Sequence, residues 1–116
     1  IKTIFLDRDG VINKEVKYLH KIEEFRFIDG IFDACNYFQN LGYKIIIITN
    51  QSGIARGYYD ENTFQKITKW MLNQFSDNDI SILDVIIALT FQMIFATAEN
   101  LNQECLLKPK TNIILI

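Results

Sequence analysis

This sequence contains little proline or histidine and has no strong net charge, and each of these shortages excludes some classes of function. Its 116 residues include one proline, one histidine and two cysteines. The cysteines, Cys35 and Cys105, have neither the spacing of a metal site nor that of a disulfide framework, which favours free thiols in a reducing cytoplasm. The formal net charge of −2 and the pI of about 5.3 give no basic surface for nucleic acid and little attraction to an anionic membrane. We therefore expect neither nucleic acid nor a membrane as a partner.

Long hydrophobic segments are missing as well. The longest apolar-rich run, residues 80–98, is interrupted by Asp84 and Gln92, and its unbroken parts are too short to span a bilayer. The first residues lack the charged region and the apolar stretch of a signal peptide. A hydrophobic fraction of 49% with nine phenylalanines instead indicates one folded domain, which we expect to be a cytoplasmic monomer.

The pattern of the first half predicts a βαβ unit. Residues 3–6 form an apolar run that ends at Asp7, as a buried parallel strand does. Helical spacing over residues 31–41 ends at Gly42, a typical helix stop. Residues 43–48, with four consecutive isoleucines, predict a second buried strand. The expected fold is therefore α/β, with a Rossmann-like parallel sheet.

The second half is regular only in part. Asp60 is placed to cap a second helix, and residues 80–89 predict a third strand. Residues 86–98 fit neither a clean strand nor a capped helix, whereas residues 112–116 are compatible with a short last strand. The second helix has one apolar face, formed by Phe64, Ile67, Met71 and Phe75.

Two aspartates follow the first predicted strand, at the edge where ligands of open α/β sheets bind. Asp7 and Asp9 are followed by Gly10, which lets the backbone turn away from the site. In phosphoryl transfer, one carboxylate of such a pair attacks phosphorus, and the other moves the protons of the leaving alkoxide and of the attacking water. Repulsion between the carboxylates calls for a hard cation, and Mg²⁺ prefers oxygen ligands. Taken alone, the pair is equally compatible with a solvated turn.

A second polar motif follows the second predicted strand. Residues 49–53 read Thr-Asn-Gln-Ser-Gly, and parallel strands bring this segment to the same sheet edge as the aspartates. A hydroxyl and free backbone N–H groups at that edge suit a phosphate oxygen, although Thr49 alone is more simply a turn or helix cap. Two such motifs in one βαβ unit favour a phosphate site.

The two motifs together resemble the haloacid dehalogenase superfamily, and within it the group of D-glycero-D-manno-heptose 1,7-bisphosphate 7-phosphatases and histidinol phosphatases. The resemblance rests on Asp-x-Asp-Gly-x-x-Asn at residues 7–13 and Thr-Asn-Gln-Ser-Gly-Ile-Ala-Arg-Gly at residues 49–57, and it covers about residues 1–85. It implies Asp7 as the nucleophile and Asp9 as the acid/base. It also implies Mg²⁺ held by the Asp7 carboxylate and the Asp9 backbone carbonyl.

The same resemblance implies the substrate contacts. Thr49 would bind the transferring phosphate and Asn50 would lie near the substrate. Gln51 would help to shape the pocket, and Arg56 is a weaker candidate for an anionic group of the substrate. The expected substrate is a small phosphorylated metabolite.

Beyond residue 85 the sequence departs from this family. The family's Arg-Lys-Pro-x-Pro-Gly motif, its late Gly-Asp and its Cys-x-His and Cys-x-Cys zinc loop are not intact, and no acidic residue follows Glu104. A phosphoryl-transfer site without that lysine and that cation ligand loses much of its electrostatic stabilisation. We therefore interpret residues 1–116 as one truncated phosphatase domain, family-like over residues 1–85 and aberrant over 86–116. We expect little or no phosphatase activity from this chain and no structural zinc.

A frameshift just after Val85 is our hypothesis for the missing motifs. Codons compatible with residues 86–105, read one nucleotide earlier, can encode Tyr-Tyr-Cys-Pro-His-Phe-Pro-Asn-Asp-Ile-Cys-Asn-Cys-Arg-Lys-Pro-Lys-Pro-Gly-Met. This run contains the family's zinc loop followed by its lysine motif. The aspartate opposite Met93 and Ile94 is forced, because methionine has a single codon. Codons that cannot encode the Arg-Lys-Pro-x-Pro-Gly run would refute the hypothesis.

Other readings remain open at this point. Histidinol phosphate is the nearest alternative substrate, and a non-catalytic phosphate-binding remnant is the alternative of another class. The acidic balance argues against a nucleic-acid 3′-phosphatase. A receiver domain would need its phosphoacceptor on a later strand, where only Asp84 is available, in mid-strand. We expect His20 to be a solvated loop residue and Tyr58 and Tyr59 to pack at the start of the second helix.

Overall fold

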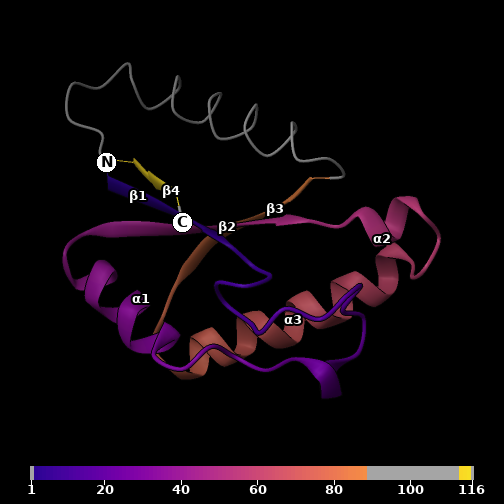
Figure 1. Ribbon diagram of the computed structural model, residues 1–116. Helices are drawn as coiled ribbons and strands as arrows, with labels where there is room; N and C mark the ends of the chain where they lie inside the picture. Colours follow the sequence, from indigo (N-terminus) through magenta and orange to yellow (C-terminus); the bar gives the residue numbers. More distant parts are fainter. Residues whose placement is uncertain (1, 89–112, 116) are drawn as a thin grey trace.

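In the described part of the chain, four parallel strands form one sheet. The computed structural model describes residues 2–88 and 113–115 (Figure 1). The strand order is β3-β2-β1-β4, and each neighbouring pair is parallel, as predicted. The strands are β1 (Lys2–Asp7), β2 (Tyr43–Asn50), β3 (Ile82–Ala88) and β4 (Ile113–Leu115).

Two longer helices lie on one face of the sheet (Figure 1). Helix α1 (Ile31–Asn40) follows a long excursion after β1 and ends before Gly42, whose φ of 90° confirms the predicted stop. Helix α3 (Glu61–Asp77) begins after Asp60, whose side chain accepts the backbone N–H of Thr63 at 2.8 Å, so the predicted cap is confirmed. Two short elements complete the described chain, η1 (Ile22–Glu24) and α2 (Ser52–Ala55).

The hydrophobic core fills the space between the sheet and these two helices. Alternate strand residues face it, and the predicted apolar face of α3 packs against them. An aromatic group extends the core beneath the excursion, with Phe27 at 4.7 Å from Phe32 and 5.9 Å from Phe75 between ring centroids. The central buried members are Ile4, Leu6, Ile45, Ile47, Ile67, Met71, Phe75 and Cys35.

The sequence placed the ends of the third strand less well. The predicted strand over residues 80–89 begins at Ile82 instead, because the turn after α3 is at residues 78–79 and residues 80–81 lead from it into the strand. Leu89 lies outside the described residues. Residues 86–88 continue β3 beside β2, and the short last strand is confirmed next to β1. The rest of the aberrant segment, residues 89–112 and 116, lies outside the described residues, and so does most of the segment to which the frameshift hypothesis applies.

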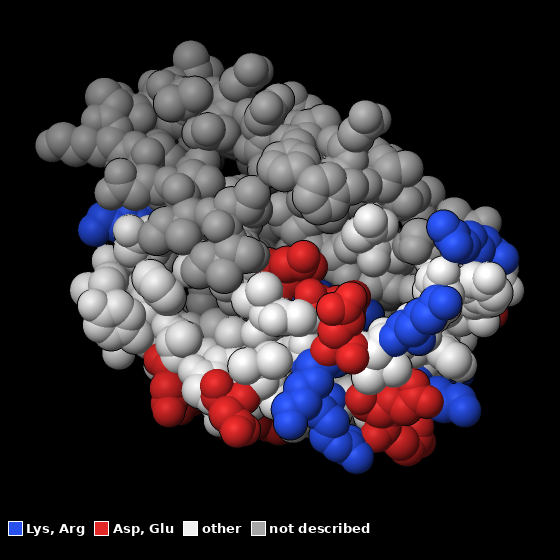
Figure 2. Space-filling view, in the orientation of Figure 1, with Lys and Arg blue, Asp and Glu red and all other residues white. Residues whose placement is uncertain are grey.

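The described surface is mixed in charge. Acidic and basic side chains are interspersed over the face shown in Figure 2. No helix in the described part of the chain is both long enough and apolar enough to cross a membrane.

Candidate active site

The carboxyl ends of β1 and β2 lie side by side and carry both motifs. Asp7 is in register with Ile48, and the backbone N–H of Arg8 donates to the Ile48 carbonyl at 3.2 Å. Thr49 is the residue of β2 that comes directly after Ile48. The structure therefore brings Asp7 and Thr49 to the same edge of the sheet, the arrangement on which the phosphatase interpretation depends.

The chain turns sharply after Asp7 and presents Asp9 to a cluster of donors. Gly10, with φ of 89°, donates its N–H to the Asn13 carbonyl at 2.8 Å. The Asp9 carboxylate accepts from Arg8 Nη2 at 3.1 and 3.2 Å, from Arg8 Nε at 3.3 Å and from Asn13 Nδ2 at 3.1 Å. These bonds fix the direction of the Asp9 carboxylate.

Two residues of this cluster had no role predicted from the sequence: Arg8, and Asn13, which ends the Asp-x-Asp-Gly-x-x-Asn motif. Arg8 is 2% exposed, and its guanidinium carbon lies 5.9 Å from the centroid of the Phe64 ring. Strand alternation offered a signal, since Arg8 lies two residues after the buried Leu6 and so continues the inward face. An arginine between two acidic residues is normally solvated, which concealed this signal.

Asp7 carries the clearest electrostatic mark of the site. Partial burial and, next, the negative charge of Asp9 raise the pKa of its carboxyl group, and the backbone N–H and the charge of Arg8 oppose this rise only in part. Two carboxylates that repel each other beside a sheet edge suit a divalent cation. Among the described residues no group of three or more His, Cys, Asp or Glu side chains could hold a metal. Mg²⁺ needs fewer protein ligands, because it keeps waters and substrate phosphate oxygens.

Thr49 lies deeper than the aspartates and is joined to two further residues. It has 0% exposed surface, and its Oγ1 accepts from Gln51 Nε2 at 2.6 Å. The Tyr59 hydroxyl in turn donates to Gln51 Oε1. Burial, ahead of the opposing charge of Arg8, raises the pKa of Tyr59, so this hydroxyl keeps its proton at neutral pH.

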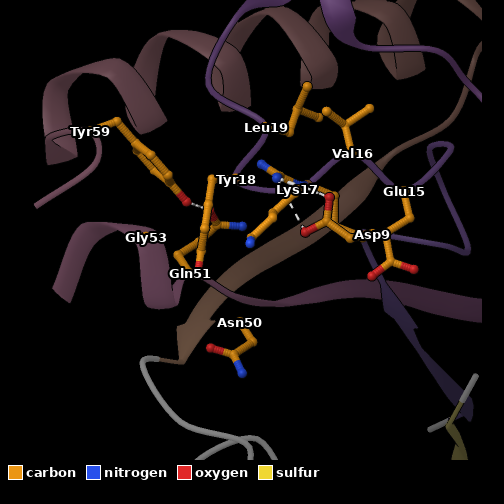
Figure 3. Close-up of a pocket in the computed structure, with 11 residues that line it drawn as sticks. Asp9, Glu15, Val16, Lys17, Tyr18, Leu19, Asn50, Gln51, Gly53 and Tyr59 are labelled. Atoms are coloured by element: carbon orange, nitrogen blue, oxygen red, sulfur yellow. Dashed lines mark hydrogen bonds and ion pairs between the residues drawn. The ribbon is translucent and has the colours of Figure 1, made fainter. Parts of the chain in front are cut away.

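A cavity of about 220 Å³ opens beside these residues (Figure 3). Three of the predicted site residues, Asp9, Asn50 and Gln51, line it, whereas Asp7, Thr49 and Arg56 do not. Figure 3 shows Tyr59 directed toward Gln51, and Asn50 lying apart from that pair. The other lining residues are Arg8, Glu15, Val16, Lys17, Tyr18, Leu19, Gly53 and Tyr59.

Aromatic side chains form one wall of the cavity, and two aromatic residues here make more contacts than the sequence predicts. His20 is not simply solvated: its ring stacks on Tyr59 at 5.8 Å between centroids, and its Nδ1 lies 2.8 Å from the Tyr18 carbonyl. Tyr59 does more than pack at the start of α3, since it lines the cavity and bonds to Gln51. Arg56 donates to the Tyr18 hydroxyl at 3.1 Å, at the outside of this wall.

Comparison with known proteins gives the same family as the two motifs. The D-glycero-alpha-D-manno-heptose-1,7-bisphosphate 7-phosphatase of Campylobacter jejuni is 57% identical over 81 residues, which cover 70% of this chain and 47% of that protein. The enzyme of the same name from Photorhabdus laumondii is 54% identical over 85 residues, or 73% and 46%. The chain thus spans about half the length of these curated relatives. No family model matches the chain.

A solved structure agrees with these relatives. The D,D-heptose 1.7-bisphosphate phosphatase of B. bronchiseptica, complexed with magnesium and phosphate, superposes with a TM-score of 0.71 at 27% identity. The superposition covers 77% of this chain and 50% of that one. Over about 70% of its length, at the amino-terminal end, the chain is therefore similar to heptose bisphosphate phosphatases in both sequence and fold.

Proposed function

We propose that this chain carries the phosphate-accepting half of a Mg²⁺-dependent phosphomonoesterase that removes the 7-phosphate of a heptose 1,7-bisphosphate. The observation that carries the proposal is the pair of carboxylates, Asp7 and Asp9, at the sheet edge that also carries Thr49. The names of the relatives supply the substrate class.

The proposed reaction uses the two aspartates in turn. A carboxylate oxygen of Asp7 attacks phosphorus, and the bond to the sugar oxygen breaks as Asp9 gives that oxygen a proton. This leaves an aspartyl-phosphate on Asp7 and a free hydroxyl on the sugar. Asp9 then takes a proton from water, whose oxygen attacks phosphorus and releases inorganic phosphate together with the restored Asp7. The cycle therefore returns Asp9 to the protonation state in which it began.

Several groups would hold the reacting phosphate. The Thr49 hydroxyl would donate to one of its oxygens, and Asn50 and Gln51 line the cavity that would receive the substrate. The Asp7 carboxylate and the Asp9 backbone carbonyl would hold Mg²⁺, which neutralises charge between the carboxylate and the phosphate when bound. Arg56 remains a candidate for a second anionic group, at the rim and beside Tyr18.

Two alternatives differ in how well they are supported. Histidinol phosphate is not favoured, because the relatives reported above act, by name, on a heptose bisphosphate. A non-catalytic remnant that binds phosphate is supported by one observation: residues 86–116 do not contain the family's intact lysine motif. We therefore expect this chain to bind phosphate and Mg²⁺ with little or no turnover.

The test compares the chain with Asp7→Asn. Isothermal titration with inorganic phosphate should show binding that requires Mg²⁺ and is lost in Asp7→Asn. Phosphate release from heptose 1,7-bisphosphate and from histidinol phosphate should be slow or absent. Phosphate binding that is equal in the two proteins would contradict the proposal. Normal turnover, abolished by Asp7→Asn, would instead refute the expected loss of activity.

The gene decides the frameshift hypothesis separately. Its codons for residues 86–105 are expected to encode the zinc-loop and lysine motifs in the adjacent frame. A chain corrected to that frame should then gain the turnover that the present chain lacks, measured as Mg²⁺-dependent phosphate release from the same bisphosphate.

A further inference from the structure

Gln51 occupies a position that the proposed reaction does not explain. It is 2% exposed, and its amide joins two other side chains at the cavity wall. Nε2 donates to Thr49 Oγ1 at 2.6 Å, and Oε1 accepts from the Tyr59 hydroxyl. Both ends of the amide are therefore engaged, each in the role that its chemistry allows.

Tyr59 is itself held firmly in place. A Cβ atom on Gly53 would lie 2.3 Å from Tyr59 Cε1, so the ring packs directly against the backbone of α2. His20 stacks on the ring at 5.8 Å, with 7° between the planes. A ring held in this way keeps its hydroxyl at the Gln51 amide, where it donates to Oε1.

The orientation of the Gln51 amide decides what Thr49 can offer. With Nε2 toward Thr49, the Thr49 oxygen is an acceptor and its own proton stays free to donate. With the amide reversed, Oε1 would accept the Thr49 proton and Nε2 would face the Tyr59 hydroxyl. A threonine whose proton is used in this way can no longer donate it to a phosphate oxygen.

We infer that Tyr59, acting through Gln51, is a positioning residue that keeps the Thr49 hydroxyl proton available to the phosphoryl group. This inference rests on the proposed function, because it assumes that Thr49 meets the phosphate. Thr49 has no exposed surface, so an entering anion must open the site locally at Thr49. The Gln51 bond uses a lone pair of Thr49 and not its proton, so it is compatible with that entry.

The main variant is Tyr59→Phe, which removes only the hydroxyl. Its matched control is Tyr58→Phe at the neighbouring position, where the side chain is 58% exposed. We expect Tyr59→Phe to weaken Mg²⁺-dependent binding of inorganic phosphate by about five- to tenfold, the size of one neutral hydrogen bond. Tyr58→Phe should leave that affinity unchanged.

A double-mutant cycle separates positioning from direct contact. In a Thr49→Val background, Tyr59→Phe should have no further effect on phosphate affinity, because its effect passes through the threonine proton. Gly53→Ala is a second route to the same outcome: its methyl group would displace the Tyr59 ring while leaving the hydroxyl intact. It should weaken phosphate binding in the same direction.

The orientation can also be read without any ligand. In ¹⁵N-edited NMR spectra, the side-chain NH₂ of Gln51 should exchange slowly with solvent in the unmodified chain and faster in Tyr59→Phe, but not in Tyr58→Phe. Unchanged exchange of the Gln51 amide protons in Tyr59→Phe would overturn the inference, whether or not the unmodified chain binds phosphate. A lack of phosphate binding in the unmodified chain would by itself contradict only the proposed function. Tighter phosphate binding in Tyr59→Phe would show that Gln51 covers Thr49, and would overturn it too.

Discussion

Two buried regions lie along the same sheet and differ in almost everything except burial. On the inward face of α3, the residues Ile67, Met71 and Phe75 are at most 2% exposed and belong to the hydrophobic core. At the carboxyl ends of β1 and β2, Arg8 and Gln51 are equally buried but polar. Burial alone therefore does not distinguish a core from a site. The bonds that the buried groups make do distinguish them.

The two regions owe their order to different forces. The apolar region gains from area removed from water, which has no preferred direction and tolerates exchanges of similar volume. The polar region gains little net free energy from burial, because each of its groups must recover bonds that water would have given. Its hydrogen bonds fix direction instead, as the donors around Asp9 do.

The largest expected effect on stability is in the apolar region. Phe75→Ala should lower the free energy of unfolding by about 3–5 kcal/mol, because the buried ring leaves a cavity. Urea denaturation measures this loss. Tyr37→Ala is the control on an exposed part of α1, with an expected change within about 0.5 kcal/mol. Phosphate affinity, measured where Phe75→Ala is still folded, should be retained. A specific loss of phosphate binding there would break the comparison.

Arg8→Met tests the opposite region. It keeps much of the side-chain volume beside Phe64 but removes three of the donor contacts to Asp9. We expect a smaller loss of stability, about 1–2 kcal/mol, because Asp9 is 26% exposed and water can replace the lost donors. Mg²⁺-dependent phosphate binding should fall more than tenfold. A stability loss as large as that of Phe75→Ala, with phosphate binding intact, would show that Arg8 is part of the core.

Sequence predicted the apolar region better than the polar one. Periodicity identified Phe64, Ile67, Met71 and Phe75 as one helix face, since water exclusion imposes the helical repeat on the sequence. It also placed Asp7 and Thr49 at one edge, because parallel strands share their polarity. These are consequences of local pattern and topology, which a single sequence contains.

The polar contacts could not be predicted in the same way. The contact of Tyr59 with Gln51, and of His20 with Tyr59, joins three separate loops, and no periodicity relates their positions. Gly53 offered a partial signal, because a glycine inside a helix is otherwise costly. A glycine at position 53 leaves space for the Tyr59 ring, and this reason for the glycine is apparent only in the three-dimensional structure.

Asp7 and Asp60 allow a finer comparison between a site carboxylate and a structural one. The raised pKa of Asp7, caused first by partial burial and next by Asp9, means that the folded chain holds a proton on Asp7 more tightly than the unfolded chain does. Its contribution to stability is therefore present at low pH and is lost as the pH rises through the ordinary carboxyl range to the raised value. Asp7→Asn should raise the midpoint of thermal unfolding at neutral pH, with no gain at pH 3. A midpoint unchanged at neutral pH would mean that burial and the charge of Asp9 do not raise the pKa of Asp7.

Asp60 should show the opposite slope and the smallest effect. Its pKa is lowered, first by the backbone N–H of Thr63, because that hydrogen bond favours the charged carboxylate at the start of α3. Its contribution is present above the ordinary carboxyl pKa and is lost as the pH falls through the lowered value. Asp60→Ala should therefore lower the unfolding midpoint slightly at neutral pH and less at pH 3, whereas Asp60→Asn, which keeps an acceptor for Thr63, should lose less. Equal effects of the two substitutions at both pH values would show that the hydrogen bond from Thr63 to Asp60 does not stabilise α3. The packing of α3 against the sheet would then be sufficient to hold the helix in place.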